Sequence, residues 1–285
     1  MAETNDEVNR VLSAQQRAQQ QEIIHALGVQ PTIDIDDERQ RREQFLVDYL
    51  RHTGGRALVL GISGGVDSLL AGLIAQHAVQ SARAQGLQAS FYALRLPYGQ
   101  QADADDAIAA VECIAPDYHH VVDIQPATDA LVAQLEAAQG PLPAAQRDYI
   151  IGNVKARQRM IAQYTCAAAH AGLVLGSDQA AEALMGYFTK YGDGAADIMP
   201  LTGLTKSQVR AMARAYGAPQ HLVDKVPTAD LESDRPLLAD EEAFGISYGD
   251  IDAFLTGQAV SPQVFEVILR HYRASAHKRQ LPAHP

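Results

Sequence analysis

Short apolar runs alternate along the middle of the chain with longer segments of helical periodicity. Four runs have the length and composition of buried strands: 56–61, 89–96, 119–124 and 172–176. Apolar residues recur at helical spacing in the segments between and after them: 68–79, 103–114, 128–138, 144–171 and 178–188. This alternation is typical of βαβ units. We therefore expect an α/β fold with a doubly wound parallel sheet of about five strands, covered by helices on both faces.

The two ends of the chain have helical patterns without strands. A helix is expected over 34–49, and Gly54 and Gly55 end it. Beyond 201, Thr205 is the predicted N-cap of a helix that stops at Gly217, and short helices are expected over 247–255 and 262–273. The chain 1–285 is thus interpreted as a single domain. Its parts are N-terminal helices (1–55), a nucleotide-binding core (56–201), and a loop with C-terminal helices (202–285).

The segment 224–242 shows neither the helical nor the strand pattern of apolar residues. It contains Pro227, Pro236 and many acids, and it is long for a connection inside a compact domain. Such loops are usually functional or disordered.

The amino-acid composition excludes several classes of protein. Lys and Arg total 23 and Asp and Glu total 34, for a net charge of −11, which argues against a protein that coats nucleic acid or an anionic membrane. No segment approaches the ~18 apolar residues of a membrane span, and residues 1–21 are too polar for a signal peptide. Cys113 and Cys166 form no C-x-x-C pair and suggest reduced thiols. A soluble, cytoplasmic protein with no nucleic-acid or membrane partner is expected.

The most informative segment is Leu-Gly-Ile-Ser-Gly-Gly-Val-Asp-Ser at 60–68, between an expected strand and helix. Its glycines let backbone N–H groups and the following helix N-terminus converge on an anion, and Ser63 and Ser68 add hydroxyls. Asp67 would repel phosphate unless a cation bridges the two, which implies Mg²⁺. No Gly-Lys-Ser/Thr follows, so this is not a Walker A loop, and the dinucleotide-binding glycine pattern is absent as well.

The loop resembles the pyrophosphate loop of the N-type ATP pyrophosphatases, which cleave ATP between the α and β phosphates and adenylate a substrate oxygen. A second segment, 175–201, closely resembles the signature of the ammonia-dependent NAD synthetases within that superfamily. Four further segments match the same family: 204–206, 227–231, 242–252 and 277–279. The resemblance runs from about residue 20 to the C-terminus.

The resemblance implies a set of site residues. The ATP-binding residues would be Gly61, Ile62, Ser63, Gly64, Gly65, Val66, Asp67, Ser68, Ser177, Lys206 and Thr228. Deamido-NAD would contact Arg157, Lys190, Asp197, His277 and Lys278. Asp67 and Glu182 would bind Mg²⁺, and with Lys206 they would form the catalytic set.

Residue spacing supports the metal site independently. Asp178 and Glu182 share a helix face just after one strand end, and Asp67 follows another. Ligands of open parallel sheets bind outside the carboxyl ends of the strands, so acids from two strand ends can converge on one metal.

The sequence departs from the family at a few positions. Ser177 stands where the family often has Thr and keeps the hydroxyl, whereas Gln179 replaces a common His and removes an ionisable group. Val66 occupies a position that is commonly Gln. The tail lacks the aromatic, acidic end of many relatives, which would weaken closure over the substrate.

The family reaction would proceed in two steps, with ATP, deamido-NAD and ammonia as substrates. The carboxylate of deamido-NAD attacks the α-phosphorus, pyrophosphate leaves, and ammonia then displaces AMP from the acyl-adenylate. Positioning and charge stabilisation suffice for this chemistry. The loop 224–242, which carries Thr228, is expected to be a lid that is mobile without ligands and excludes water.

The resemblance also leads to predictions about the nitrogen donor and the oligomeric state. Only about 55 residues precede the loop strand, too few for a glutamine amidase domain, so ammonia is expected to be the direct donor. The family is typically homodimeric, and the apolar faces of 1–50 and 144–171 can supply the interface.

Two other functions remain open from the residues alone. A tRNA-modifying ATP pyrophosphatase would need basic surface and usually cysteines, which this composition disfavours. A non-catalytic nucleotide-binding paralogue is disfavoured by the intact Asp67, Glu182, Lys206 and Thr228.

Overall fold

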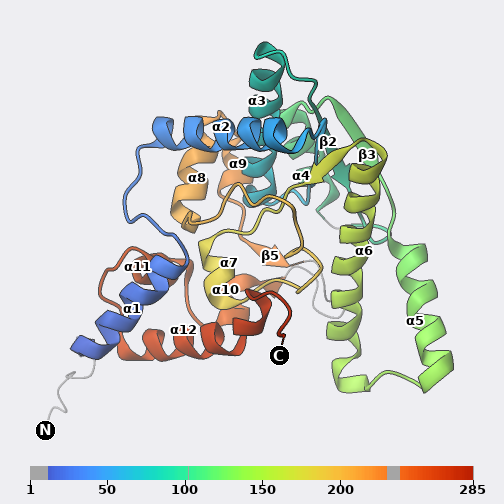
Figure 1. Cartoon of the computed structure of the whole chain (residues 1–285). Coiled ribbons are helices and arrows are strands. Elements are labelled where there is room, and N and C mark those ends of the chain that lie inside the picture. Colours follow the sequence, from blue (N-terminus) through green and yellow to red (C-terminus); the bar gives the residue numbers. More distant parts are fainter. Residues whose placement is uncertain (1–11, 102, 230–237, 285) are drawn as a thin grey trace, which may run out of the picture.

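The fold is built on a parallel sheet with the strand order β3-β2-β1-β4. Figure 1 shows its strands β2 and β3 in the upper part of the molecule. The computed structural model describes residues 12–101, 103–229 and 238–284. The strands of the sheet are β1 (Ala57–Gly61), β2 (Ser90–Arg95), β3 (Tyr118–Val121) and β4 (Gly172–Val174). All three pairings are parallel, so the expected α/β class and parallel sheet are confirmed.

The sheet has four strands within the described residues, against the expected five or so. Beyond β4, Leu175 and Ile198 form an isolated parallel bridge where a fifth strand would start. Pro200 follows two residues later and has no N–H to donate. The ladder therefore does not continue there.

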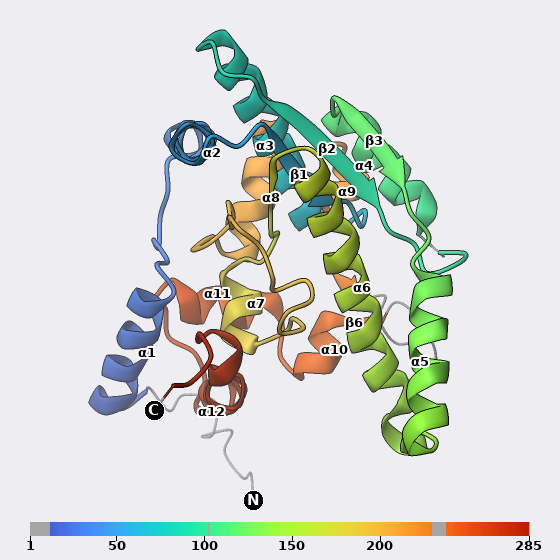
Figure 2. The ribbon, with the colours of Figure 1, turned by 45° about the vertical axis from the view of Figure 1, so that its right-hand side comes forward.

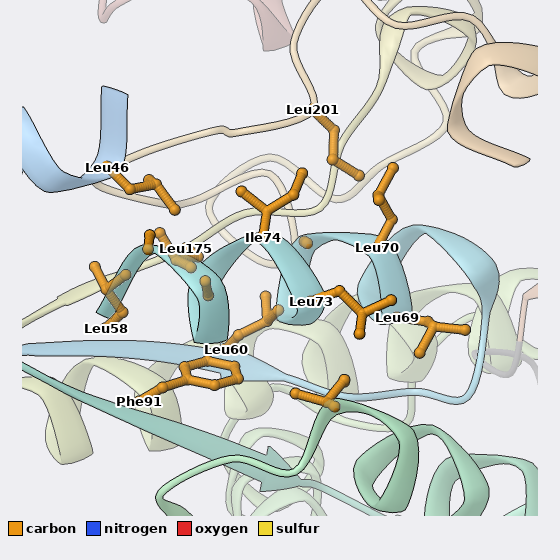
Figure 3. Packing of buried hydrophobic residues seen from close by; sticks show 14 of the residues in the cluster. Leu46, Leu58, Leu60, Leu69, Leu70, Leu73, Ile74, Phe91, Leu175 and Leu201 are labelled. Atoms are coloured by element: carbon orange, nitrogen blue, oxygen red, sulfur yellow. The ribbon is translucent and has the colours of Figure 1, made fainter. Parts of the chain in front are cut away.

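Helices cover both faces of the sheet. The side chains of β1 point alternately to the two faces and pack into two separate apolar cores. Leu58 and Leu60 belong to one apolar cluster with residues of α2 (Ile35–Thr53) and α3 (Val66–Ala84). Figure 3 shows these leucines and Phe91 of β2 beside the leucine-rich face of α3. Ala57 and Val59 face the opposite way, into a cluster that contains Ala167 of α6 (Arg147–Ala169). The sheet is thus doubly wound, as the alternating pattern predicts.

The remaining helices of these two layers are close to the predicted ranges. The α3 side also carries α4 (Ala104–Ile114), α8 (Lys206–Ala215) and α9 (Gln220–Val223). The α6 side carries α5 (Gln125–Gln139) and a 3₁₀ turn, η1 (Ala144–Gln146), which leads into α6. None of the described helices is both long enough and apolar enough to cross a membrane.

Helix α7 (Ala180–Met185) is shorter than the predicted 178–188. Gly186 takes a left-handed conformation with φ of 65° and its N–H donates to the Glu182 carbonyl, which ends the helix.

A second apolar core joins the two ends of the chain. It is built by α1 (Ala14–Ala26), α7, α10 (Asp240–Phe244), α11 (Tyr248–Leu255) and α12 (Pro262–Ala274), which precedes the 3₁₀ turn η2 (Ala276–Lys278). Gln20 of α1 donates hydrogen bonds from Nε2 to the carbonyls of Phe254 (2.9 Å) and Gln258 (3.0 Å). Figure 2 shows this helical layer below the sheet, so segments from opposite ends of the sequence lie side by side.

The segment 224–242 is more regular at its ends than predicted. Strands β5 (Thr228–Ala229) and β6 (Leu238–Ala239) pair antiparallel, and α10 follows directly. Residues 230–237, the middle of the expected lid, lie outside the described residues. The structure therefore fixes Thr228 on a short hairpin, while the mobility of the lid stays a prediction.

A buried arginine, Arg42, ties α2 to the segment that precedes α8. Arg42 donates from Nε to Glu38 Oε1 (2.8 Å), from Nη2 to the Thr202 carbonyl (3.0 Å), and from Nη1 to the Pro200 carbonyl. Arg41 pairs with the same carboxylate, but its side chain is 60% exposed against 7% for Arg42.

We expect Arg42→Met to lower the free energy of unfolding by roughly 3–5 kcal/mol, because it leaves buried polar groups without their partner. The matched variant Arg41→Met should cost less than about 1 kcal/mol, since its guanidinium is exposed. Urea denaturation of both variants measures the difference. Equal losses would contradict the assignment of Arg42 as the buried tie.

Candidate functional site

A pocket opens at the carboxyl ends of β1 and β4. These strands are neighbours, but the chain leaves β1 toward β2 on one side and reaches β4 on the other only after α6. This is the switch point at which ligands of open α/β sheets bind. The pocket has a volume of about 490 Å³ and is lined by the loops after both strands, part of α6, and the β5–β6 hairpin.

The glycine loop between β1 and α3 has a conformation that requires Gly64. Its φ is 88°, and a Cβ placed there would lie 2.7 Å from the backbone N of Ala107 in α4. The loop is held by its own hydroxyls: Ser63 N donates to Ser68 Oγ (3.2 Å), and Gly65 N donates to Ser63 Oγ (3.3 Å). The N-terminus of α3 follows at Val66, so the loop has the geometry of an anion site.

A buried ion pair in the pocket joins the loop segment to α8. Lys206 Nζ donates to Asp67 Oδ2 at 2.6 Å, and the lysine side chain is only 2% exposed. Burial lowers the pKa of Lys206, but the charges of Asp67 and Glu182 outweigh this and raise it above its ordinary value. The lysine is therefore charged.

Two elements fix where the Lys206 side chain starts. Thr205 caps α8 through a capping box with Gln208, which confirms the predicted N-cap. Asp252 of α11 accepts hydrogen bonds from Lys206 N (3.1 Å) and Ser207 N (2.8 Å). Two of the N–H groups that lack an intrahelical partner at the start of α8 are thus bound by a carboxylate, which also suits the helix dipole.

Asp178, Glu182 and Asp193 are further acids of the pocket lining. Burial, and next the charges of Asp67 and Asp178, hold the pKa of Glu182 well above its usual range. Burial, and next the charges of Asp193 and Asp67, do the same to the pKa of Asp178. Burial also raises the pKa of Asp193. Burial and mutual repulsion therefore oppose full ionisation of these carboxyl groups, and a bound cation would favour their charged form.

Glu182 and Gln179 together start α7. Gln179 N donates to Glu182 Oε2 (3.1 Å), and the Gln179 side chain accepts from Ala181 N (2.6 Å). Gln179, which stands where the resemblance expects His, thus acts as an N-cap and orients the carboxylate.

These acids could hold a magnesium ion only if a bound substrate supplied further oxygen ligands. No group of three or more His, Cys, Asp or Glu side chains in the described ranges is arranged to hold a metal. Asp67 Oδ1, however, is buried without a hydrogen-bond partner. Mg²⁺ is commonly held by one or two carboxylates completed by substrate phosphates and water. Asp67 and Glu182 are close enough for their charges to interact, so they could supply the one or two carboxylates of such a site.

The pocket brings together most of the predicted ATP-binding set. The lining contains Gly61, Ile62, Ser63, Gly65, Val66, Asp67, Ser68, Ser177, Lys206 and Thr228, as well as Glu182. Gly64 turns away toward α4 instead.

The predicted deamido-NAD residues separate into three groups. Lys278 lines the pocket, where Nζ donates to the carbonyls of Gly186 (2.9 Å) and Phe188 (2.8 Å).

Arg157, Lys190, His277 and Asp197 are described by the structure but are not among the residues that line the pocket. Lys190 Nζ donates to the His277 carbonyl (2.5 Å), and Arg157 Nη2 donates to the Lys190 carbonyl (3.2 Å). Asp197 is engaged elsewhere, since Oδ2 accepts from Val174 N at 2.8 Å.

Sequence reasoning missed several lining residues. Asp193 stands between two glycines, a signal that could have identified it. Arg159 lies on α6 and donates from Nε to the Leu96 carbonyl (3.0 Å). Lys225 pairs with Asp103 and Asp106 at 2.7 Å each, across more than 100 residues of chain, so no local pattern reveals it.

Comparisons with known proteins agree on one family. A family model described as NAD synthase matches residues 38–282. An NH(3)-dependent NAD(+) synthetase from Streptomyces coelicolor is 56% identical over 269 residues, covering 94% of this chain and 98% of the relative. The crystal structure of NAD+ synthetase from Burkholderia pseudomallei has a TM-score of 0.82 at 50% identity and covers 96% of this chain and 99% of that one. The structure of NMN synthetase from Francisella tularensis has a TM-score of 0.77 at 36% identity, covering 89% and 99%.

We expect Gly64→Ala to lower the free energy of unfolding by roughly 2–4 kcal/mol, from a strained φ and a clash with α4. Gly86→Ala is the matched control, because its φ is 82° but a Cβ there meets no atom within 4 Å. It should cost only about 1–2 kcal/mol of backbone strain. Equal losses in urea denaturation would show that α4 does not confine the loop.

Proposed function

The chain belongs to the NAD synthase family, and from this premise we propose that it catalyses the ATP-dependent amidation of deamido-NAD to NAD. Ammonia would be the nitrogen donor, and AMP and pyrophosphate the other products, which makes the enzyme a ligase that forms a C–N bond. The observation that carries the proposal is the buried Asp67–Lys206 pair, which joins the glycine loop to α8 inside the pocket.

ATP binds, in this proposal, with its phosphates on the loop 61–68 and the N-terminus of α3. Ser177, Thr228 and Lys206 complete the ATP contacts, and all three line the pocket. Mg²⁺ held by Asp67 and Glu182 would neutralise phosphate charge. Lys206 stabilises the charge that builds on pyrophosphate as it leaves.

Deamido-NAD is expected on the basic side of the pocket. Lys278 lies inside it, and Arg157, Lys190 and His277 are linked to one another beside it. These groups suit a dinucleotide that carries two phosphates. For Asp197 the proposal rests on the family resemblance alone.

The chemistry needs positioning rather than a nucleophilic side chain. A carboxylate oxygen of deamido-NAD forms a bond to the α-phosphorus while the bond to pyrophosphate breaks. Ammonia then adds to the acyl carbon, loses a proton and expels AMP. The hairpin that carries Thr228 borders the pocket, which supports the proposal that 224–242 shields the acyl-adenylate from water.

A homodimer is supported by apolar side chains on the α5–α6 side. Tyr149 is 59% exposed and Ile161 49%, and Leu131 and Leu135 of α5 and Val121 of β3 are exposed as well. The 1–50 helices are a weaker candidate, because Leu46, Val47 and Leu50 lie within the core. The free thiols of Cys113 and Cys166 fit a reducing compartment, and we propose the cytoplasm.

Purified protein incubated with ATP, Mg²⁺, ammonium and deamido-NAD should form NAD and AMP in equal amounts, resolved by chromatography. Glutamine in place of ammonium should give no NAD. Nicotinic acid mononucleotide is the comparison substrate, because one structural relative is named an NMN synthetase.

Failure to form NAD and AMP would remove the proposal and favour a non-catalytic paralogue. Faster turnover of the mononucleotide would correct the substrate.

Lys206→Met should lower kcat/KM by about 100- to 1,000-fold, since a preorganised charge at the leaving pyrophosphate is lost. Arg214→Met is the control on the same helix: its pair with Asp224 is exposed at the surface. It should stay within about twofold of the wild type. A comparable loss in both variants would mean that α8 is disturbed as a whole.

A further inference from the structure

We propose that Tyr248 is the positioning residue that aligns Lys206, and that through Asp240 it couples the lysine to the hairpin carrying Thr228. The inference rests on the proposed function, since it assigns Lys206 to the ATP phosphates. Neither Tyr248 nor Asp240 belongs to the set that the family resemblance implies.

One face of α11 holds both ends of Lys206. Asp252 binds the backbone N–H of the lysine, as described above. Tyr248, one turn earlier on α11, places its ring 4.9 Å from Lys206 Nζ. Tyr248 is 5% exposed and Lys206 only 1%, so this cation–π contact is shielded from water. A flexible four-carbon side chain is thereby restricted at its base and at its charged end.

The hydroxyl of Tyr248 reaches in the opposite direction. It donates to Asp240 Oδ2 at 2.8 Å. Asp240 follows β6 directly and lines the pocket, and its backbone N donates to the Pro227 carbonyl at 3.0 Å. Pro227 precedes Thr228 in the sequence. A continuous path of contacts therefore runs from Thr228 through Pro227, Asp240 and Tyr248 to Lys206.

Asp240 is suited to transmit a change along this path. It is 6% exposed, and its Oδ1 is buried with no hydrogen-bond partner, so the bond from Tyr248 is the side-chain hydrogen bond that holds it. An ATP contact that shifts Thr228 changes the position of Asp240, and the Tyr248 ring moves with it. Lys206 would then be aligned only when the hairpin is in place, which restricts adenylation to the fully liganded pocket.

The test compares substitutions that separate the hydroxyl from the ring. Tyr248→Phe keeps the ring beside Lys206 and removes the bond to Asp240, whereas Tyr248→Leu removes both. Tyr216→Phe is the matched control: Tyr216 caps the other end of α8, and its hydroxyl donates to Glu43 Oε1 at 2.6 Å, away from the pocket. ATP–pyrophosphate exchange dependent on deamido-NAD isolates the adenylation step.

We expect Tyr248→Phe to slow exchange about tenfold, in line with one buried hydrogen bond. Tyr248→Leu should slow it about 100-fold, and Tyr216→Phe should leave it unchanged. The KM for deamido-NAD should stay within about twofold in all three, because Lys206 acts on ATP. Equal exchange rates in Tyr248→Phe and Tyr216→Phe would overturn the proposal. Tyr248→Phe carries the test even if the leucine variant fails to fold.

A double variant distinguishes positioning from general support. If Tyr248 acts through Lys206, Tyr248→Phe should have no further effect in the Lys206→Met background. Multiplicative losses would show that Tyr248 acts elsewhere and would overturn the proposal. A wild-type enzyme that forms no NAD would instead disprove the proposed function, so the two failures are distinguishable.

Discussion

The structure of the pocket depends on a lysine ammonium that is charged and removed from water. Such a group is tolerated only where charges and hydrogen bonds replace its hydration. Asp67 provides the direct contact at 2.6 Å, and Glu182 adds a second negative charge. Asp252 fixes the backbone and Tyr248 supplies a ring face. These residues lie on helices that belong to both apolar cores, so the site forms where the sheet and the C-terminal helices meet.

The charge balance of the pocket also constrains what it accepts. Burial raises the pKa of Asp178, Glu182 and Asp193, and the nearby charge of Asp67 adds to this effect at Asp178 and Glu182. A polyanion would be repelled from such a pocket unless it arrived with a cation. The acidity of the whole chain, with its net charge of −11, is therefore compatible with a phosphate-bearing substrate.

Features with a local cause were predictable from the sequence. The strands, the glycine loop and the Thr205 cap follow from short-range patterns, and the structure confirms them. Features with a long-range cause were not. The pair of Lys206 with Asp67, the link of Tyr248 to Asp240 and the hairpin around Thr228 depend on how distant segments pack. The early end of the sheet was also missed, because it depends on a proline beyond the last bridge.

The distance along the chain between the partners of the pocket has a consequence for folding. Lys206 and Asp67 are separated by 139 residues, and Asp252 lies still further along. A partly folded chain with only the sheet in place has no such pocket. A bound nucleotide would therefore act as a cross-link between the two layers and favour the complete structure over every incomplete one. At a hundredfold excess over Kd this linkage is worth about 2.7 kcal/mol, a sizeable share of the stability of an ordinary domain. Supply of substrate would then protect the protein from unfolding and degradation as well as drive its turnover.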